Sequence, residues 1–160
     1  MNSFLAVPPT TTTSAPSDDD VIVNDGWFPD LSMAAMREAM RVDGTITPAR
    51  LRPALVSAIL DANRQLADWQ AQQQAAGRDK LEAVPAPHID GCSMLVARYL
   101  RAVYSTAKAD LTERYRDFDS TAEGLKKAEA LDAAIDEQRR NAHWAIADII
   151  GRPRSTVELI

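Results

Sequence analysis

Hydrophobic side chains recur every three or four residues through the middle of the chain, as they do on one face of an α-helix. This apolar stripe consists of Leu51, Leu55, Ala58, Ile59, Ala62, Leu66 and Trp69. Thr47-Pro48 is typical of a helix start, and Gly77 is typical of the position just after a helix. The pattern predicts one helix of about 29 residues, roughly 43 Å long, with Pro53 tolerated in its first turns.

A shorter helix is predicted before it, over residues 31 to about 41. Asp30 is the expected N-cap, because its carboxylate can accept from free N–H groups of the first turn. One face carries Met33, Met36 and Met40. Asp43-Gly44 then ends the helix.

Two further helices are predicted in the second half of the chain. The third follows Ser93, its expected cap, and the fourth starts between residues 121 and 132 and ends at Ile150, before Gly151 and Pro153. Apolar positions of the third are Leu95, Val96, Tyr99, Val103, Ala107, Leu111 and Phe118, and those of the fourth are Leu131, Ile135, Ala142, Ile146 and Ile149. The fold class predicted is all-α, a four-helix domain with two long helices.

Polar, proline-punctuated segments separate and flank these helices. Residues 8–20 are too poor in apolar side chains to offset the entropy of ordering them. We therefore expect a disordered or extended N-terminal arm at 1–25, a helical adaptor domain at 26–151 and an extended C-terminal arm at 152–160. Val21-Ile22-Val23 can pair as a strand with a neighbouring subunit or lie along its own domain. Residues 78–92 are predicted to form a loop.

Composition strengthens the helical prediction and limits the partners. Alanine, the best helix former, occurs 27 times, whereas glycine occurs 6 times and aromatic residues make up 6%. Four aspartates within residues 1–25 carry most of the formal net charge of −5, so the remainder is almost neutral and offers no general affinity for DNA. A single cysteine excludes an internal disulfide, and no stretch is apolar enough to predict a membrane span.

Motifs of catalysis and metal binding are missing from the sequence. It contains no phosphate-binding glycine loop and no nucleophile or zinc-protease signature. His88 and Cys92 stand four residues apart in the proline-rich loop without further ligands, which favours plain loop residues over a metal site. Asp136 and Arg140 are spaced as an ordinary surface ion pair. We expect no catalytic residues, no cofactor and no metal.

Basic residues gather on one side of the third predicted helix. Arg98, Arg101, Lys108 and Arg116 lie roughly opposite its apolar face and are interleaved with tyrosines, a pattern that can mark a nucleic-acid surface. Nearby acidic residues largely cancel this charge. The pattern therefore favours a solvated or subunit-contacting face, and a small helical DNA-binding protein is the alternative.

The C-terminal segment has an apolar end after a firm helix stop. Its candidate contact residues are Arg152, Pro153, Arg154, Val157, Leu159 and Ile160. One possibility is a tail that folds back over the bundle. The other is an arm that reaches a partner and pairs with its sheet edge or groove.

Four segments together resemble the head completion (head stabilisation) protein of the P2-like tailed phages. They are Asp25-Gly26-Trp27-Phe28-Pro29-Asp30, residues 39–47 with 50–52, residues 104–111 with 114–119, and the end from Trp144 to Ile160. The resemblance covers about residues 24–160 and leaves the Thr/Pro/Asp-rich arm outside it.

The resemblance implies a structural, non-enzymatic function in virus assembly. Such proteins bind beneath the portal ring at the capsid vertex after DNA packaging, complete the filled head and provide a platform for the tail or a tail-terminator protein. Similar adaptors are helical homo-oligomers in twelve-fold rings, and packaged DNA passes through the lumen without sequence-specific binding. The implied location is the head–tail neck of the virion, after assembly in the host cytoplasm. A terminal extension that reaches the portal fits residues 152–160.

Overall fold

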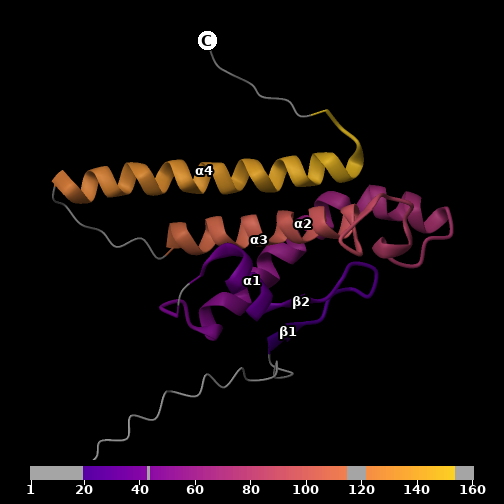
Figure 1. The fold of residues 1–160 in the computed structure, drawn as a ribbon, viewed down its shortest axis with the longest axis horizontal. Coiled ribbons are helices and arrows are strands. Elements are labelled where there is room, and N and C mark those ends of the chain that lie inside the picture. The colour runs from indigo at the N-terminus through magenta and orange to yellow at the C-terminus, as the bar shows by residue number, and fades with distance from the viewer. Residues whose placement is uncertain (1–19, 43, 115–121, 154–160) are drawn as a thin grey trace, which may run out of the picture.

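Four helices form the body of the protein in a computed structural model that describes residues 20–42, 44–114 and 122–153 (Figure 1). The helices are α1 (Met33–Met40), α2 (Pro48–Ala75), α3 (Met94–Arg114) and α4 (Ala122–Ile150). A 3-10 turn, η2, spans Leu81–Ala83. Two short antiparallel ladders pair β1 (Val21–Ile22) with β2 (Leu31–Ser32) and β3 (His88–Ile89) with β4 (Cys92–Ser93). The four predicted helices are confirmed, although Phe118 of the third lies outside the described residues, and the fold is mostly helical rather than strictly all-α.

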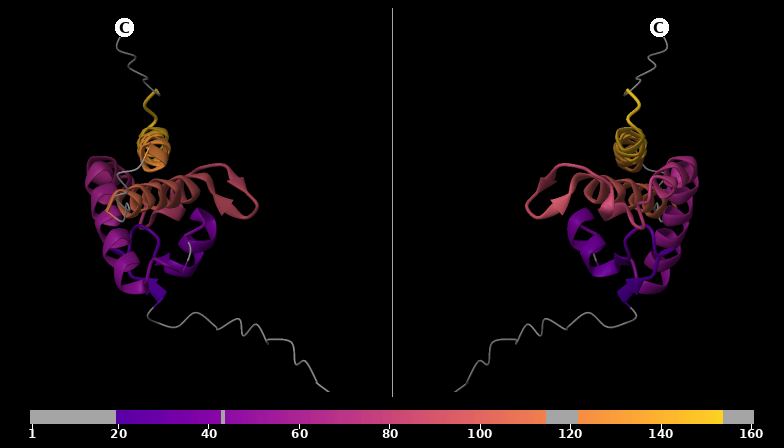
Figure 2. Two further views of the ribbon diagram at one scale, coloured as in Figure 1. Left: turned by 90° about the vertical axis from the view of Figure 1, so that its left-hand side faces the viewer. Right: turned by 90° about the vertical axis from the view of Figure 1, so that its right-hand side faces the viewer.

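Helix α3 lies at the centre of the bundle. It packs along α4 on one side and against α2 on another, and α1 also contacts it, whereas α2 and α4 meet only over a short stretch. The end-on views show this arrangement, with α3 enclosed by the other helices (Figure 2). The side chains of Tyr99, Ala102 and Val103 on α3 are consequently almost fully buried. No helix in the described part of the chain is long and apolar enough to cross a membrane.

The apolar stripe predicted along α2 is its buried face. Leu51, Leu55 and Leu66 are fully buried, and Trp69 packs partly buried against the same core. Helix α2 runs unbroken through Pro53 and begins at Pro48 as expected, although the Thr47 side chain makes no capping hydrogen bond. The helix ends at Ala75, and Gly77 follows it with a φ of 80°, as predicted.

The start of α1 differs from the prediction. Its N-cap is Ser32, whose Oγ accepts from the N–H of Ala35 at 3.2 Å, and not Asp30. Asp30 lies before β2 and instead accepts from the N–H of Asn24 at 2.8 Å. The carboxylate is therefore used to close the turn between β1 and β2, which removes it from the helix end.

The segment from Asp20 to Asp25 is part of the packed domain. Val21 pairs with Ser32 and Ile22 with Leu31, and Ile22 is buried. Of the two possibilities for Val21-Ile22-Val23, the structure therefore shows the one in which the segment lies along its own domain. Residues 1–19 of the predicted arm lie outside the described residues.

The predicted loop at 78–92 contains η2 and the β3–β4 hairpin. Asp90 and Gly91 have φ of 52° and 72°, the left-handed conformations that a two-residue type I′ turn requires. The N–H of Met94 donates to the carbonyl of Pro87 at 3.0 Å and joins the hairpin to the start of α3. Helix α3 begins after Ser93 as predicted, but the Ser93 Oγ is buried and makes no hydrogen bond.

Candidate functional site

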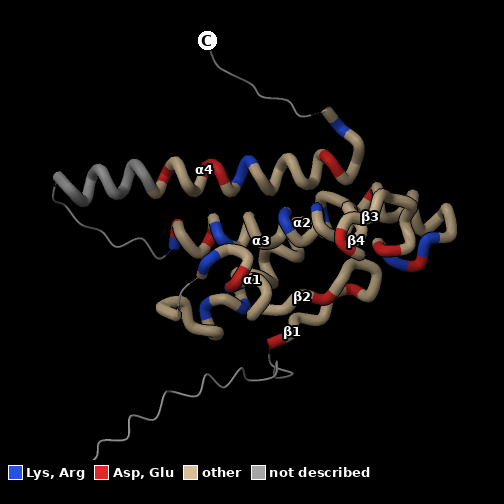
Figure 3. The backbone as a smooth tube through the Cα atoms, in the orientation of Figure 1, with Lys and Arg blue, Asp and Glu red and all other residues tan. Residues whose placement is uncertain are grey.

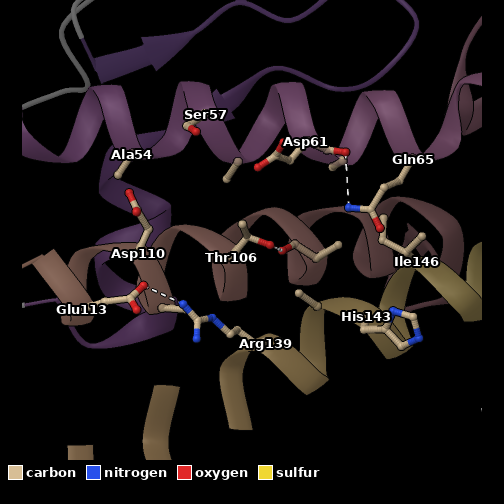
Figure 4. Close-up of a pocket in the computed structure, with 15 residues that line it drawn as sticks. Ala54, Ser57, Asp61, Gln65, Thr106, Asp110, Glu113, Arg139, His143 and Ile146 are labelled. Atoms are coloured by element: carbon tan, nitrogen blue, oxygen red, sulfur yellow. Dashed lines mark hydrogen bonds and ion pairs between the residues drawn. The ribbon is translucent and has the colours of Figure 1, made fainter. Parts of the chain in front are cut away.

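A groove of about 290 Å³ runs between α2, α3 and α4 (Figure 4). Small side chains from the three helices form much of its lining: Ala54, Ala58, Ala62, Ala102, Ala109 and Ala142. Methyl side chains let α3 approach both neighbours closely, and they leave this space where α2 and α4 diverge. The groove is thus a consequence of the alanine-rich helices.

Two ion pairs involve side chains that line the groove. Arg139 on α4 donates to Glu113 on α3 at 2.6 Å, and both side chains are about half exposed, so solvent screens the pair. Arg114 donates to the Oδ1 of Asp110 at 2.7 Å, whereas the Oδ2 of Asp110 is buried without a hydrogen-bond partner. His143 also lines the groove. Among the described residues, no group of three His, Cys, Asp or Glu is placed to hold a metal ion.

The basic residues predicted on α3 do not form one free surface. The guanidinium of Arg98 donates to the Asp148 carbonyl oxygen at 3.2 Å and lies 3.8 Å from the Asp148 carboxylate. Arg101 donates to Asn141 at 2.8 Å. Both arginines therefore bind α4 to α3, while Lys108 is half-buried and Arg116 lies outside the described residues. Acidic and basic residues occur together along α3 and the described part of α4, so neither helix carries charge of one sign only (Figure 3).

Helix α4 ends where the sequence predicted, and the chain then leaves the bundle. Gly151 takes a φ of 74°, and the N–H of Arg152 donates to the Ala147 carbonyl at 2.9 Å, which closes the last turn. Arg152 and Pro153 are exposed, and the other candidate contact residues, Arg154, Val157, Leu159 and Ile160, lie outside the described residues. The C-terminal end of α4 and strand β1 lie on opposite sides of the bundle (Figure 1).

Comparison with known proteins shows what kind of protein carries these surfaces. The family model of the phage head completion protein (GPL) matches residues 22–160. The head completion/stabilization protein of Escherichia phage P2 is 46% identical over 140 residues, which cover 88% of this chain and 83% of the relative. The chain belongs to the phage head completion protein family. No solved structure matches it.

Membership of this family gives the chain a structural role in head assembly and not an enzymatic one. The resemblance found in four segments of the sequence is confirmed, because the family match extends over nearly all of the described residues.

A buried polar network, which the sequence did not reveal, fixes the N-terminal segment of this family member to the bundle. The hydroxyl of Tyr99 donates to Asn63 Oδ1 at 2.7 Å and accepts from Asn24 Nδ2 at 2.9 Å. Asn63 Nδ2 in turn donates to Asn24 Oδ1 at 2.9 Å. Burial raises the pKa of Tyr99 well above its ordinary value; the Asn24 hydrogen bond opposes this rise and the Asp25 charge adds to it.

Aromatic packing surrounds this network. The ring of Phe28 stacks on Tyr99 with centroids 4.6 Å apart, and Trp27 meets Phe28 and Trp69 edge to face. The Trp27 indole N–H donates to the carbonyl of Arg78 at 3.1 Å. The motif Asp25 to Asp30, one of the segments that carried the family resemblance, is therefore a structural anchor: it docks the N-terminal segment on α2 and α3.

Proposed function

We propose that the chain binds beneath the portal ring at the capsid vertex after DNA packaging, closes the filled head and provides the platform for tail attachment. The observation that carries this proposal is the 46% identity, over 88% of the chain, to a protein named for head completion and stabilisation. The location this implies is the head–tail neck of the virion, reached after assembly in the host cytoplasm. The tail-side partner is a tail or tail-terminator protein.

The proposed assembly is a twelve-fold ring of this chain on the portal. Packaged DNA passes through the lumen of the ring without sequence-specific binding. The formal net charge of −5 is consistent with this, since a wall without excess positive charge does not hold the phosphates of a passing duplex. The engagement of Arg98 and Arg101 with α4 also leaves less basic surface for the alternative, a DNA-binding protein.

The proposed portal contact is the C-terminal arm, residues 152–160. Its support is the sharp end of α4 at Gly151 and the exposure of Arg152 and Pro153 at the point where the chain leaves the helical body. The arm carries two arginines followed by an apolar end, a combination suited to a groove or sheet edge on a partner protein.

Co-sedimentation with purified portal rings tests the proposal. We expect the full chain to pellet with the rings and to add density at their tail-facing end in electron micrographs. Deletion of residues 152–160 should abolish pelleting while the circular dichroism of the helices stays unchanged. Deletion of the other terminal segment, residues 1–19, is the control and should leave pelleting unchanged. Failure of the full chain to bind would refute the function, whereas normal binding by the 152–160 deletion would refute only the arm assignment.

A further inference from the structure

Apolar side chains are exposed on two opposite sides of the bundle. The large exposed ones among the described residues are Val23, Val56, Leu60 and Ile89. Val56 and Leu60 are one turn apart on the outer face of α2, with exposed fractions of 38% and 64%. Ile89 is 68% exposed in the β3–β4 hairpin, and Val23 belongs to the N-terminal segment, directly after β1.

The hairpin presents Ile89 in a fixed position. His88 pairs with Ser93 and Ile89 with Cys92, and the type I′ turn at Asp90-Gly91 matches the twist of the two strands. The hairpin also begins a helix directly, since α3 starts at Met94. Ile89, next to the turn of this projecting hairpin, can therefore contact the surface of a neighbouring protein.

The hairpin and the outer face of α2 cannot meet within one molecule. Viewed end-on, the hairpin projects from one side of the bundle and α2 forms the opposite side (Figure 2). A second copy in the same orientation brings them together. Such a contact uses two different surfaces and is therefore heterologous, the kind that generates a ring when its rotation closes.

The hairpin and α2 carry net charges of opposite sign, −1 and +1. The hairpin, residues 88–93, carries Asp90 and no lysine or arginine, whereas α2 carries three arginines and two aspartates. Arg52 and Arg64 lie one turn from Val56 and Leu60, respectively, on the exposed side of the helix, and Arg52 also donates to the carbonyl of Val21 at 3.5 Å. The Arg64 side chain is 78% exposed, and its pairing with Asp61 uses only part of its hydrogen-bonding capacity.

We propose that the β3–β4 hairpin of one copy docks on the outer face of α2 of the next copy. Ile89 then contacts Val56 and Leu60, and the Asp90 carboxylate faces Arg64. The inference rests on the proposed ring assembly and deepens it, because it names the two surfaces that join neighbouring subunits.

The single native cysteine makes this contact directly testable. Cys92 is exposed in the hairpin, so a Leu60→Cys variant carries one thiol on each proposed surface. The two thiols of one molecule lie on opposite sides of the bundle and cannot bond to each other, because a disulfide needs Cα atoms about 4.4–6.8 Å apart. Mild oxidation should therefore give a ladder of dimer, trimer and higher species on non-reducing gels, collapsed by reductant. An Ala39→Cys variant, exposed on α1, should give no ladder beyond the dimer.

Two arms of the experiment separate this inference from the proposed function. The Leu60→Cys chain is oxidised at high concentration alone and, in parallel, after mixing with portal rings, and pelleting with the rings is scored independently. A ladder in either arm supports the contact. Absence of a ladder in both arms overturns it, whether or not the chain pellets with the portal, and pelleting alone decides the proposed function.

Charge reversal gives a second, independent readout. Asp90→Arg should weaken self-association up to about fivefold, as expected for an exposed ion pair, and Arg64→Asp should do the same. The double variant should recover most of the loss, while circular dichroism confirms that each variant is folded. Losses that simply add in the double variant would show that Asp90 and Arg64 do not face each other.

Discussion

Removal of one buried hydroxyl should weaken the whole N-terminal half of the fold. Tyr99→Phe keeps the stack on Phe28 but loses the hydrogen bond donated to Asn63 and the one accepted from Asn24. Each such bond contributes about 0.5–1.5 kcal/mol net, and the Asn63 oxygen is left without this donor. We therefore expect the free energy of unfolding to fall by about 2 kcal/mol. For a domain of this size, that loss lowers Tm by roughly 4–8 °C.

Urea unfolding followed by tryptophan fluorescence measures this change, since Trp27 and Trp69 lie beside the network. The matched control is Tyr104→Phe. Tyr104 is 8% exposed, but its hydroxyl makes no hydrogen bond to any residue in the described ranges, so its loss should cost under about 0.5 kcal/mol. Equal stability of wild type and Tyr99→Phe, or equal losses for the two variants, would refute the energetic role of the network.

Three other perturbations test further parts of the same structure. Because the pKa of Tyr99 is raised in the fold, the unfolded chain ionises first, so the contribution of Tyr99 to stability should be constant below about pH 9 and should fall above pH 10 by about 1.4 kcal/mol per pH unit. Burial also raises the pKa of Tyr104, which adds to the fall. Urea unfolding between pH 9 and 11 should therefore show a shallower fall for Tyr99→Phe than for the wild type. Gly77→Ala places a Cβ at a φ of 80° and should cost roughly 1–2 kcal/mol by thermal unfolding, whereas Gly44→Ala, without a positive φ, should cost nothing. Arg98→Gln should lower the unfolding free energy by about 1 kcal/mol through loss of its contacts with Asp148, and a gel shift with DNA at low salt that depends on Arg98 would contradict that reading.

The helices could be predicted because their apolar spacing is regular and their ends carry clear signals. Over 28 residues of α2 the stripe from Leu51 to Leu66 has one period, and Gly77 takes the left-handed conformation that follows the helix. The N–H of Arg78 reaches the Gln73 carbonyl at 3.0 Å across it. Apolar spacing and helix-end residues involve only neighbouring positions along the chain, so they can be predicted from the sequence alone.

The strands β2, β3 and β4 escaped prediction because a strand of two residues cannot display an alternating pattern. The sequence predicts a helix from Leu31 because the preceding Asp30 has the right chemistry for a cap. Only the tertiary position of Asn24 decides where that carboxylate binds. The hairpin did offer a signal, the Asp90-Gly91 pair typical of a type I′ turn, but the neighbouring prolines favoured a loop.

The candidate surfaces show the same division between local and long-range information. Periodicity placed Arg98 and Arg101 on one side of α3, and the structure shows that α4 covers part of that side. The face of a helix that remains exposed to solvent depends on where the other helices pack. The sequence of one helix does not predict this packing. The portal contact at residues 152–160 remains a prediction from the sequence and the family.

Truncation can decide where the domain begins. The alanine-rich helices contribute many small side chains to the core, so the core also depends on large side chains from outside the helices. The residues before α1 supply several of them: Ile22, Trp27 and Phe28 are each at most 5% exposed. Removal of residues 1–19 should therefore leave Tm unchanged. Truncation to residues 26–160, which starts at the domain boundary predicted from the sequence, removes β1, the buried Ile22 and the Asn24 hydrogen bonds. Loss of a buried isoleucine alone costs about 2–5 kcal/mol, and the unpaired Tyr99 and Asn63 add to it. Against a typical total stability of about 5–15 kcal/mol, this truncation should lower Tm by more than 10 °C in a thermal melt or prevent folding. Equal melting of the two truncated chains would show that the fold begins at residue 26 after all.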